Sequence, residues 1–168
     1  MIEVAFFDFD DTLIVHSYLD GHEPNEGVED CANIWLGDRY NDETYMAPLV
    51  MQLFVLELNR KGIPCYGLTY DANSMAANIK KTILDEKYPK CFKEVIVTAT
   101  PEKKIEVMKG YCRAFNVPLK NVLFVDDRQP TLDLSRQSGI TSTTPQEVLC
   151  KDVCAIMKEL GFKDESNS

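Results

Sequence analysis

The sequence has 168 residues, of which 45% are hydrophobic, and this favours one compact domain with a sizeable core over two full domains. Its formal net charge of −9 argues against a nucleic-acid-binding surface, because phosphate backbones are held by clustered Lys and Arg. No apolar run approaches the roughly 18 residues that span a bilayer, so we expect no membrane segment.

The first residues and the cysteines bear on the cellular compartment. Met1 leads directly into an apolar stretch, without the basic region and long apolar segment of a secretory signal. The six cysteines form no Cys-x-x-Cys pair and lie mostly in apolar segments, a pattern typical of buried, reduced thiols. Cys150 and Cys154 are interpreted in the same way, because no His or further Cys lies near them. We therefore expect a cytoplasmic protein.

The apolar run Ile2 to Phe7 predicts a buried parallel strand, and carboxylates follow it at once. If the chain is still extended there, Asp8 and Asp10 project to the same side. Two like charges that close require a shared proton or a bound cation, and a hard divalent cation is the natural candidate. One Asp can then attack an electrophile while the other moves protons. The plainer alternative is that both acids only cap a turn.

The segment from Val15 to Tyr45 is the least regular part of the sequence. It is rich in acidic residues and glycine, and Arg39 is its only Lys or Arg. A loop this long in a compact domain is usually functional or disordered, and we predict a short flap or reduced cap with a helix around 28–36. Trp35 could stack on a sugar or base of a ligand, or only pack the flap on the domain.

The rest of the chain alternates between strand and helix patterns. Strands are predicted at 63–69, 95–98, 121–125 and 139–143, and helices at 48–61, 71–84, 100–115, 130–138 and 145–160. The last helix opens with Thr144 to Glu147, which has the form of a capping box. Such alternation implies a parallel sheet covered on both faces. We predict a doubly wound, Rossmann-like, three-layer α/β/α domain at 1–162, with about five strands, an insert at 15–45 and a frayed polar tail at 163–168.

Further polar residues fall at the predicted carboxyl edge of this sheet. Thr69 ends the second strand, and Asp126 and Asp127 follow the fourth. Lys103 and Lys104 begin the helix after the third strand, where the helix dipole disfavours cations, so their position calls for compensation. Neighbours on a helix point about 100° apart, so only one of the two lysines can face the edge.

The stretch Asp8-Phe9-Asp10-Asp11-Thr12 resembles the first motif, Asp-x-Asp-x-Thr, of the haloacid dehalogenase-like (HAD) phosphohydrolases. The polar residues of the other strands and the Lys pair resemble the three remaining motifs, and the resemblance extends from residue 2 to about 160. It implies a HAD-type fold and a phosphatase that depends on Mg²⁺, of the small-cap or capless kind.

The resemblance also implies a role for each matching residue. Asp8 would be the nucleophile that forms an aspartyl-phosphate, and Asp10 would protonate the leaving alcohol and later activate water. Phosphate would be bound by residues of three motifs, namely Thr12, Thr69, Tyr70 and Lys104. Mg²⁺ would be held by Asp8, the backbone carbonyl of Asp10, Asp126 and Asp127. Lys104 is preferred over Lys103 because it lies twenty-two positions before Asp126, a spacing similar to that of capless members.

Two features depart from the family pattern. Tyr70 follows Thr69 where many relatives have Asn, and no Asn follows the acidic pair, so that Thr131 or Asp133 would have to replace its contacts. The presence of Asp10 argues against carbon–halogen hydrolysis, since the dehalogenase branch generally lacks this residue.

The predicted function is hydrolysis of a phosphomonoester, either a small phosphorylated metabolite or a phosphoprotein. Two alternatives are a non-catalytic protein that binds a phospho-ligand or a protein partner, and a phosphotransferase with an acceptor other than water. No nucleic acid or membrane partner is expected.

Overall fold

The computed structural model describes residues 1–16, 45–71, 76–151 and 153–162. The strands are β1 (Val4–Phe7), β2 (Val15–His16), β3 (Tyr45–Met46), β4 (Cys65–Tyr70), β5 (Phe92–Thr98), β6 (Val122–Val125) and β7 (Thr141–Thr143). The helices are α2 (Leu49–Arg60), α3 (Ala76–Lys87), α4 (Lys103–Phe115), the 3₁₀ turn η1 (Leu119–Asn121), α5 (Gln129–Gln137), α6 (Pro145–Leu149) and α7 (Val153–Glu159).

The central sheet has five parallel strands in the order β5-β4-β1-β6-β7, which confirms the predicted α/β architecture. β1 is the middle strand, and Phe7 lies opposite Gly67 of β4 on one side and Val125 of β6 on the other. Because all strands run the same way, their carboxyl ends share one edge, and the strand order reverses beside β1. In open α/β sheets this is where ligands bind.

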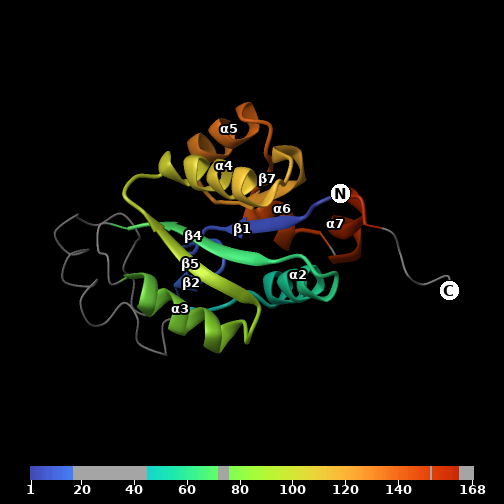
Figure 1. The fold of residues 1–168 in the computed structure, drawn as a ribbon. Helices are drawn as coiled ribbons and strands as arrows, with labels where there is room; N and C mark the ends of the chain where they lie inside the picture. Colours follow the sequence, from blue (N-terminus) through green and yellow to red (C-terminus); the bar gives the residue numbers. More distant parts are fainter. Residues whose placement is uncertain (17–44, 72–75, 152, 163–168) are drawn as a thin grey trace.

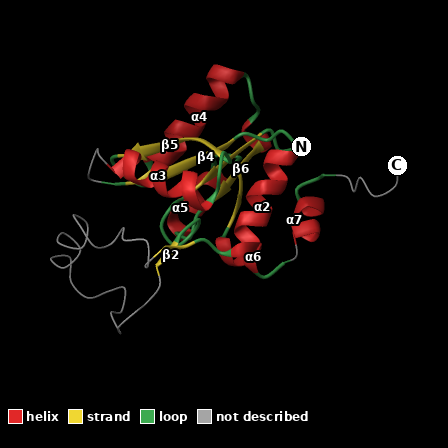
Figure 2. Cartoon of the chain, turned by 90° about the horizontal axis from the view of Figure 1, so that it is seen from below, coloured by secondary structure: helices red, strands yellow, loops and turns green. Residues whose placement is uncertain are grey.

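Helices cover both faces of the sheet, and the alternation of side chains along β1 separates two cores. Phe7 belongs to the core under α2, α3, α6 and α7, whereas Phe6 belongs to the core under α4 and α5 (Figure 1). Figure 2 shows α2, α6 and α7 together on one side of the molecule. Both Phe side chains are fully buried, and each such burial contributes about 1.5 to 3 kcal/mol. The strand that leads to the acidic motif is therefore firmly anchored.

The insert begins and ends at neighbouring points. β2 and β3 form an antiparallel pair in which Val15 lies opposite Met46 and His16 opposite Tyr45. The two ends of the segment between β2 and β3 therefore lie side by side. The helix predicted around 28–36 lies outside the described residues, and the division into domain, flap and tail stays a prediction.

The start of α4 and the division of the last helix differ from expectation. Helix α4 begins at Lys103 instead of Pro101, because the preceding turn is closed by tighter i to i−3 bonds from Lys103 N–H to Thr100 O and from Lys104 N–H to Pro101 O. The predicted last helix is two helices, α6 and α7. Apolar residues recur at helical spacing through both α6 and α7, because both helices pack against the core under α2. The spacing therefore does not indicate where the first helix ends.

The structure confirms one further prediction about local structure and contradicts another. The capping box is confirmed, since Thr144 Oγ1 accepts from Glu147 N–H and the Glu147 carboxylate accepts from Thr144 N–H, both at 3.1 Å. The prediction of buried thiols is wrong for Cys150 and Cys154, which are exposed at the end of α6 and on α7. Among the described helices, none has the length and apolarity needed to cross a membrane.

Candidate active site

The first motif lies on a tight turn instead of an extended strand. β1 ends at Phe7, and the N–H groups of Leu13 and Ile14 then both donate to Phe9 O, at 3.1 and 3.0 Å. Asp11 has a left-handed φ of 55°, which Asp tolerates better than most residues. The chain is therefore not extended from Asp8 to Asp10, and the two carboxylates contact lysines on different helices.

Asp8 lies in a buried cluster with Lys104 and Asp126. Lys104 Nζ is 2.6 Å from Asp8 Oδ1 and 2.8 Å from Asp126 Oδ2, so the second residue of α4 joins the ends of β1 and β6. Asp8, Lys104 and Asp126 are 6%, 1% and 0% exposed. Lys103 is exposed, so Lys104 is the lysine that reaches the acids.

The charges of this cluster are unbalanced. Burial raises the pKa of Asp8 to about 7; the Lys104 ammonium opposes this shift and the Asp126 carboxylate adds to it. Burial, and then the Asp126 charge, also raise the pKa of Asp127. For Lys104 burial acts to lower the pKa, but the two carboxylates that it contacts outweigh burial and raise it. Lys104 therefore stays protonated, but its single positive charge does not neutralise all the carboxylates around it.

The donor set fits a divalent cation. Carboxylate oxygens of Asp8, Asp126 and Asp127 lie within 4.8 Å of one another. Three carboxylates and one ammonium leave a formal charge of two negative when all are ionised, which is what Mg²⁺ would balance. Oxygen ligands of this kind are the ones that Mg²⁺ prefers. The carboxylate of Asp10 is not part of this group, and the role of its backbone carbonyl as a ligand stays a prediction.

Asp10 instead contacts a second buried lysine that the sequence analysis missed. Lys80, on α3, is 0% exposed, and its Nζ lies 2.7 Å from Asp10 Oδ2 and 2.9 Å from Thr69 Oγ1. Asp71 Oδ2 is 3.6 Å from the same nitrogen. The signal was available, because Lys80 lies on the buried stripe of α3 with Ala76, Ile83 and Leu84, where a charged residue requires a partner.

The other residues that the sequence assigns to the site differ in burial and in hydrogen-bond partners. Thr69 is 1% exposed at the end of β4, whereas the next residue, Tyr70, is 42% exposed. Thr12 is 1% exposed, and its hydroxyl has no hydrogen-bond partner in the described part of the chain. Asp133 lies on the surface of α5, where it contacts Gln129 and Arg136 instead of the acidic cluster. Thr131 is buried on the same helix.

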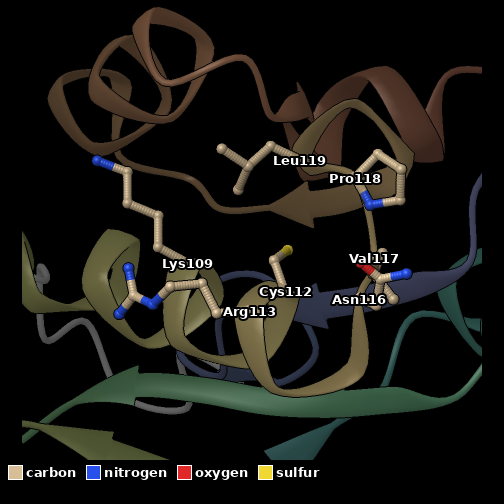
Figure 3. A pocket seen from close by; sticks show the side chains of 7 residues that line it. All are labelled: Lys109, Cys112, Arg113, Asn116, Val117, Pro118 and Leu119. Carbon is tan, nitrogen blue, oxygen red and sulfur yellow. The ribbon is translucent and has the colours of Figure 1, made fainter.

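A cavity of about 450 Å³ lies elsewhere, along the later part of α4 and the loop that follows it (Figure 3). Its lining consists of Lys109, Cys112, Arg113, Asn116, Val117, Pro118 and Leu119. Cys112 comes eight residues after Lys104 on the same helix, or about 12 Å along its axis at 1.5 Å per residue. This cavity is therefore not part of the acidic site.

No family model matches the chain, and no curated protein is significantly similar to it in sequence. Solved structures do resemble it in fold. A putative haloacid dehalogenase-like hydrolase from Bacteroides fragilis has a TM-score of 0.61 at 13% identity, covering 90% of this chain and 94% of that chain. A HAD family enzyme from Bacteroides thetaiotaomicron, in complex with magnesium and inorganic phosphate, has a TM-score of 0.53 at 15% identity, covering 86% and 94%.

A third similar structure is the N-terminal part of another Bacteroides fragilis protein, which contains a phosphatase domain complexed with Mg. It has a TM-score of 0.59 at 14% identity and covers 97% of this chain and 41% of that chain. At identities this low the likeness concerns the fold alone. Together with the strand order, it shows that the chain has the fold of the HAD superfamily hydrolases.

Proposed function

We propose that the protein is a Mg²⁺-dependent phosphomonoester hydrolase that works through an aspartyl-phosphate on Asp8. The observation that carries this proposal is the buried cluster at the carboxyl end of the central strand, where Lys104 holds Asp8 beside Asp126 and near Asp127. A carboxylate held against a lysine, beside further acids that could hold a cation, can attack a phosphorus atom whose negative charge would otherwise repel it.

The reaction would proceed in two displacements at phosphorus. Oδ1 of Asp8 accepts from Lys104, which leaves Oδ2 to form the bond to phosphorus as the ester P–O bond breaks. Protonated Asp10 would give its proton to the leaving alkoxide. Asp10 would then take a proton from water, whose oxygen attacks phosphorus and breaks the Asp8–phosphate bond, so phosphate leaves, Asp8 is again a carboxylate and Asp10 is again protonated.

The other groups offset the charge on the transferring phosphoryl group. The Lys104 ammonium and the Thr69 hydroxyl would each donate to its oxygens, in a buried site where such interactions are stronger than in water. Asp8, Asp126 and Asp127 would hold Mg²⁺, which when bound supplies positive charge for the phosphate oxygens.

The substrate that we propose is a small phosphorylated metabolite or a phosphoprotein. The net charge of −9 disfavours a long polyanion such as a nucleic acid. A single phosphate group could still be bound locally by Lys104 and the cation whatever the charge of the whole chain.

The test is turnover of p-nitrophenyl phosphate, phosphometabolites and phosphopeptides with Mg²⁺. We expect turnover that chelation removes and that Asp8→Asn abolishes, while Asp133→Asn, which replaces a surface acid on α5, leaves activity unchanged. Acid-quenched protein should carry a phosphoryl group on Asp8. A Mg²⁺-loaded protein inactive on the whole panel would contradict the proposal, and phosphate transfer to added alcohols in preference to water would make the protein a phosphotransferase.

A further inference from the structure

Lys80 is a charged residue at a buried helix position where an apolar residue is usual. Its helix, α3, packs closely on β4, since a Cβ added to Gly67 would come within 3.3 Å of Leu84 Cδ1 and 3.2 Å of Val95 Cγ2. Lys80 lies on the same buried stripe as Leu84, and its ammonium lies 4.9 Å from the centre of the Phe9 ring. A buried ammonium is strongly disfavoured unless it is paired, and two of the partners of Lys80, Asp10 and Thr69, are residues of the first two motifs.

The bond to Thr69 determines which way the Thr69 hydroxyl points. An ammonium can only donate hydrogen bonds, so Thr69 Oγ1 must accept from Lys80 and its own hydrogen must point elsewhere. That hydrogen is directed to the Tyr70 carbonyl at 3.4 Å, which is a long bond. A phosphoryl oxygen is a better acceptor for it. Lys80 thereby makes Thr69 a donor toward the site, which is what an anionic ligand requires.

The bond to Asp10 fixes the orientation of a second group. Oδ2 of Asp10 accepts from Lys80 at 2.7 Å, which holds the plane of a carboxylate whose side chain is 25% exposed. An acid that must meet a leaving group and later a water molecule acts efficiently only when it is held in place. The same lysine therefore joins the turn after β1 to the end of β4.

An apolar side chain of similar size would fill the same space on α3, but it would leave the Asp10 carboxylate and the buried Asp71 carboxylate without this cation. It would not bind acceptor oxygens of Asp10 and Thr69 at once. The contacts of Lys80 are thus suited to alignment of the two groups more than to holding the helix on the sheet.

We propose that Lys80 is a positioning residue of the phosphoryl-transfer site, which aligns the Asp10 carboxylate for proton transfer and the Thr69 hydroxyl for donation to phosphate. The inference rests on the proposed function, because it assigns Lys80 a role through two residues of that reaction. Lys80 itself is fully buried and acts through these neighbours.

The first experiment compares Lys80→Met with Lys81→Met in steady-state hydrolysis of p-nitrophenyl phosphate with Mg²⁺. Lys81 is the next residue of α3, but its side chain is 30% exposed and pairs with Asp85, so it is a matched control. We expect Lys80→Met to lower kcat by about 10- to 100-fold with a smaller change in KM, and Lys81→Met to stay within about 2-fold. Equal kinetics of the two variants would overturn the proposal.

The second experiment separates positioning from a general structural effect. Lys80→Met is introduced into Asp10→Asn, into Thr69→Val and into the combination of both. If Lys80 acts through these residues, its loss should shrink in each single background and fall to about 2-fold or less in the combined one. The same fold-loss in every background would mean that Lys80 only supports the fold, and the proposal would be wrong.

Lys80→Gln is measured in parallel, because Lys80→Met could fail to fold. Its neutral amide keeps donors at the end of the side chain, so we expect an intermediate loss of kcat and the same non-additivity. Failure of the two proposals can be told apart. If the wild type shows no Mg²⁺-dependent turnover, both proposals are wrong. If the wild type is active, Asp8→Asn is inactive and Lys80→Met has the same kinetics as Lys81→Met, only the role of Lys80 is wrong.

Discussion

Lys104 and Lys80 reach the same edge of the sheet from opposite layers, and their surroundings differ in charge. Lys104, on the α4 face, contacts two carboxylates that are almost fully buried, with a third close by. Lys80, on the α3 face, contacts one partly exposed carboxylate and a neutral hydroxyl, with Asp71 at 3.6 Å. Two lysines with similar burial therefore have different neighbours.

The two lysines differ in how many carboxylates surround each ammonium group. On the Lys104 side three carboxylates face one ammonium, and burial, with a smaller contribution from the Asp126 charge, raises the pKa of Asp8. On the Lys80 side two carboxylates, of Asp10 and Asp71, and one uncharged hydroxyl face one ammonium, so the excess of acids is smaller. We infer that nucleophile and cation belong to the Lys104 side, and that proton transfer and hydrogen-bond alignment belong to the Lys80 side.

The largest contrast should appear in catalysis. Lys104→Met removes a cation that contacts Asp8, the proposed nucleophile, and we expect kcat/KM to fall by about 10³-fold, well beyond the loss expected for Lys80→Met. Lys103→Met is the matched control, because this neighbouring side chain is exposed and should be silent. Steady-state kinetics on p-nitrophenyl phosphate measure both. If the two buried lysines gave equal losses, the difference in roles would not hold.

A smaller effect should appear in stability when Mg²⁺ is added. If Mg²⁺ binds the Asp8, Asp126 and Asp127 group, it should raise the free energy of unfolding by about 2.7 kcal/mol at 100 times its Kd. Urea unfolding in Mg²⁺ and in chelator measures this gain. We expect Asp127→Asn to reduce it and Lys80→Met to keep it. Loss of the gain in Lys80→Met would show that the two sides are not separate.

The smallest effect concerns the pH dependence of the metal-free protein. Because folding raises the pKa of Asp8 from 3.8 to about 7, its contribution to stability is complete below the unfolded value and is lost as pH rises through the folded value. Asp8→Asn removes that loss. At pH 8 in chelator we expect the variant to be more stable than wild type by roughly 1 to 3 kcal/mol, and this advantage should disappear near pH 4.

Urea unfolding across this pH range, with Asp133→Asn as a surface control, measures the dependence. An advantage of Asp8→Asn that stayed constant with pH would mean that ionisation of Asp8 is not its cause. Addition of Mg²⁺ at pH 8 should reverse the order, because the wild type then gains a cation that the variant binds poorly.

The sheet could be predicted because its signals are local. Apolar runs of strand length, helical spacing between them and Gly or Pro at their ends indicate an alternating α/β chain, and each of the five predicted strands is present. Parallel topology then brings the ends of β1, β4 and β6 to one edge. The grouping of Asp8 with Asp126 and Asp127 follows from this, since it needs only the positions of strand ends.

The amino-acid sequence by itself thus determined the architecture and the strand ends where polar residues gather. Only the tertiary structure decided which lysine reaches which acid. Lys104 and Asp8 are 96 positions apart and Lys80 and Asp10 are 70 apart, so their pairing depends on how α4 and α3 pack on opposite faces of the sheet. The tight turn around Asp11 ends the extended chain that the strand pattern predicted, and Asp8 and Asp10 then contact different lysines.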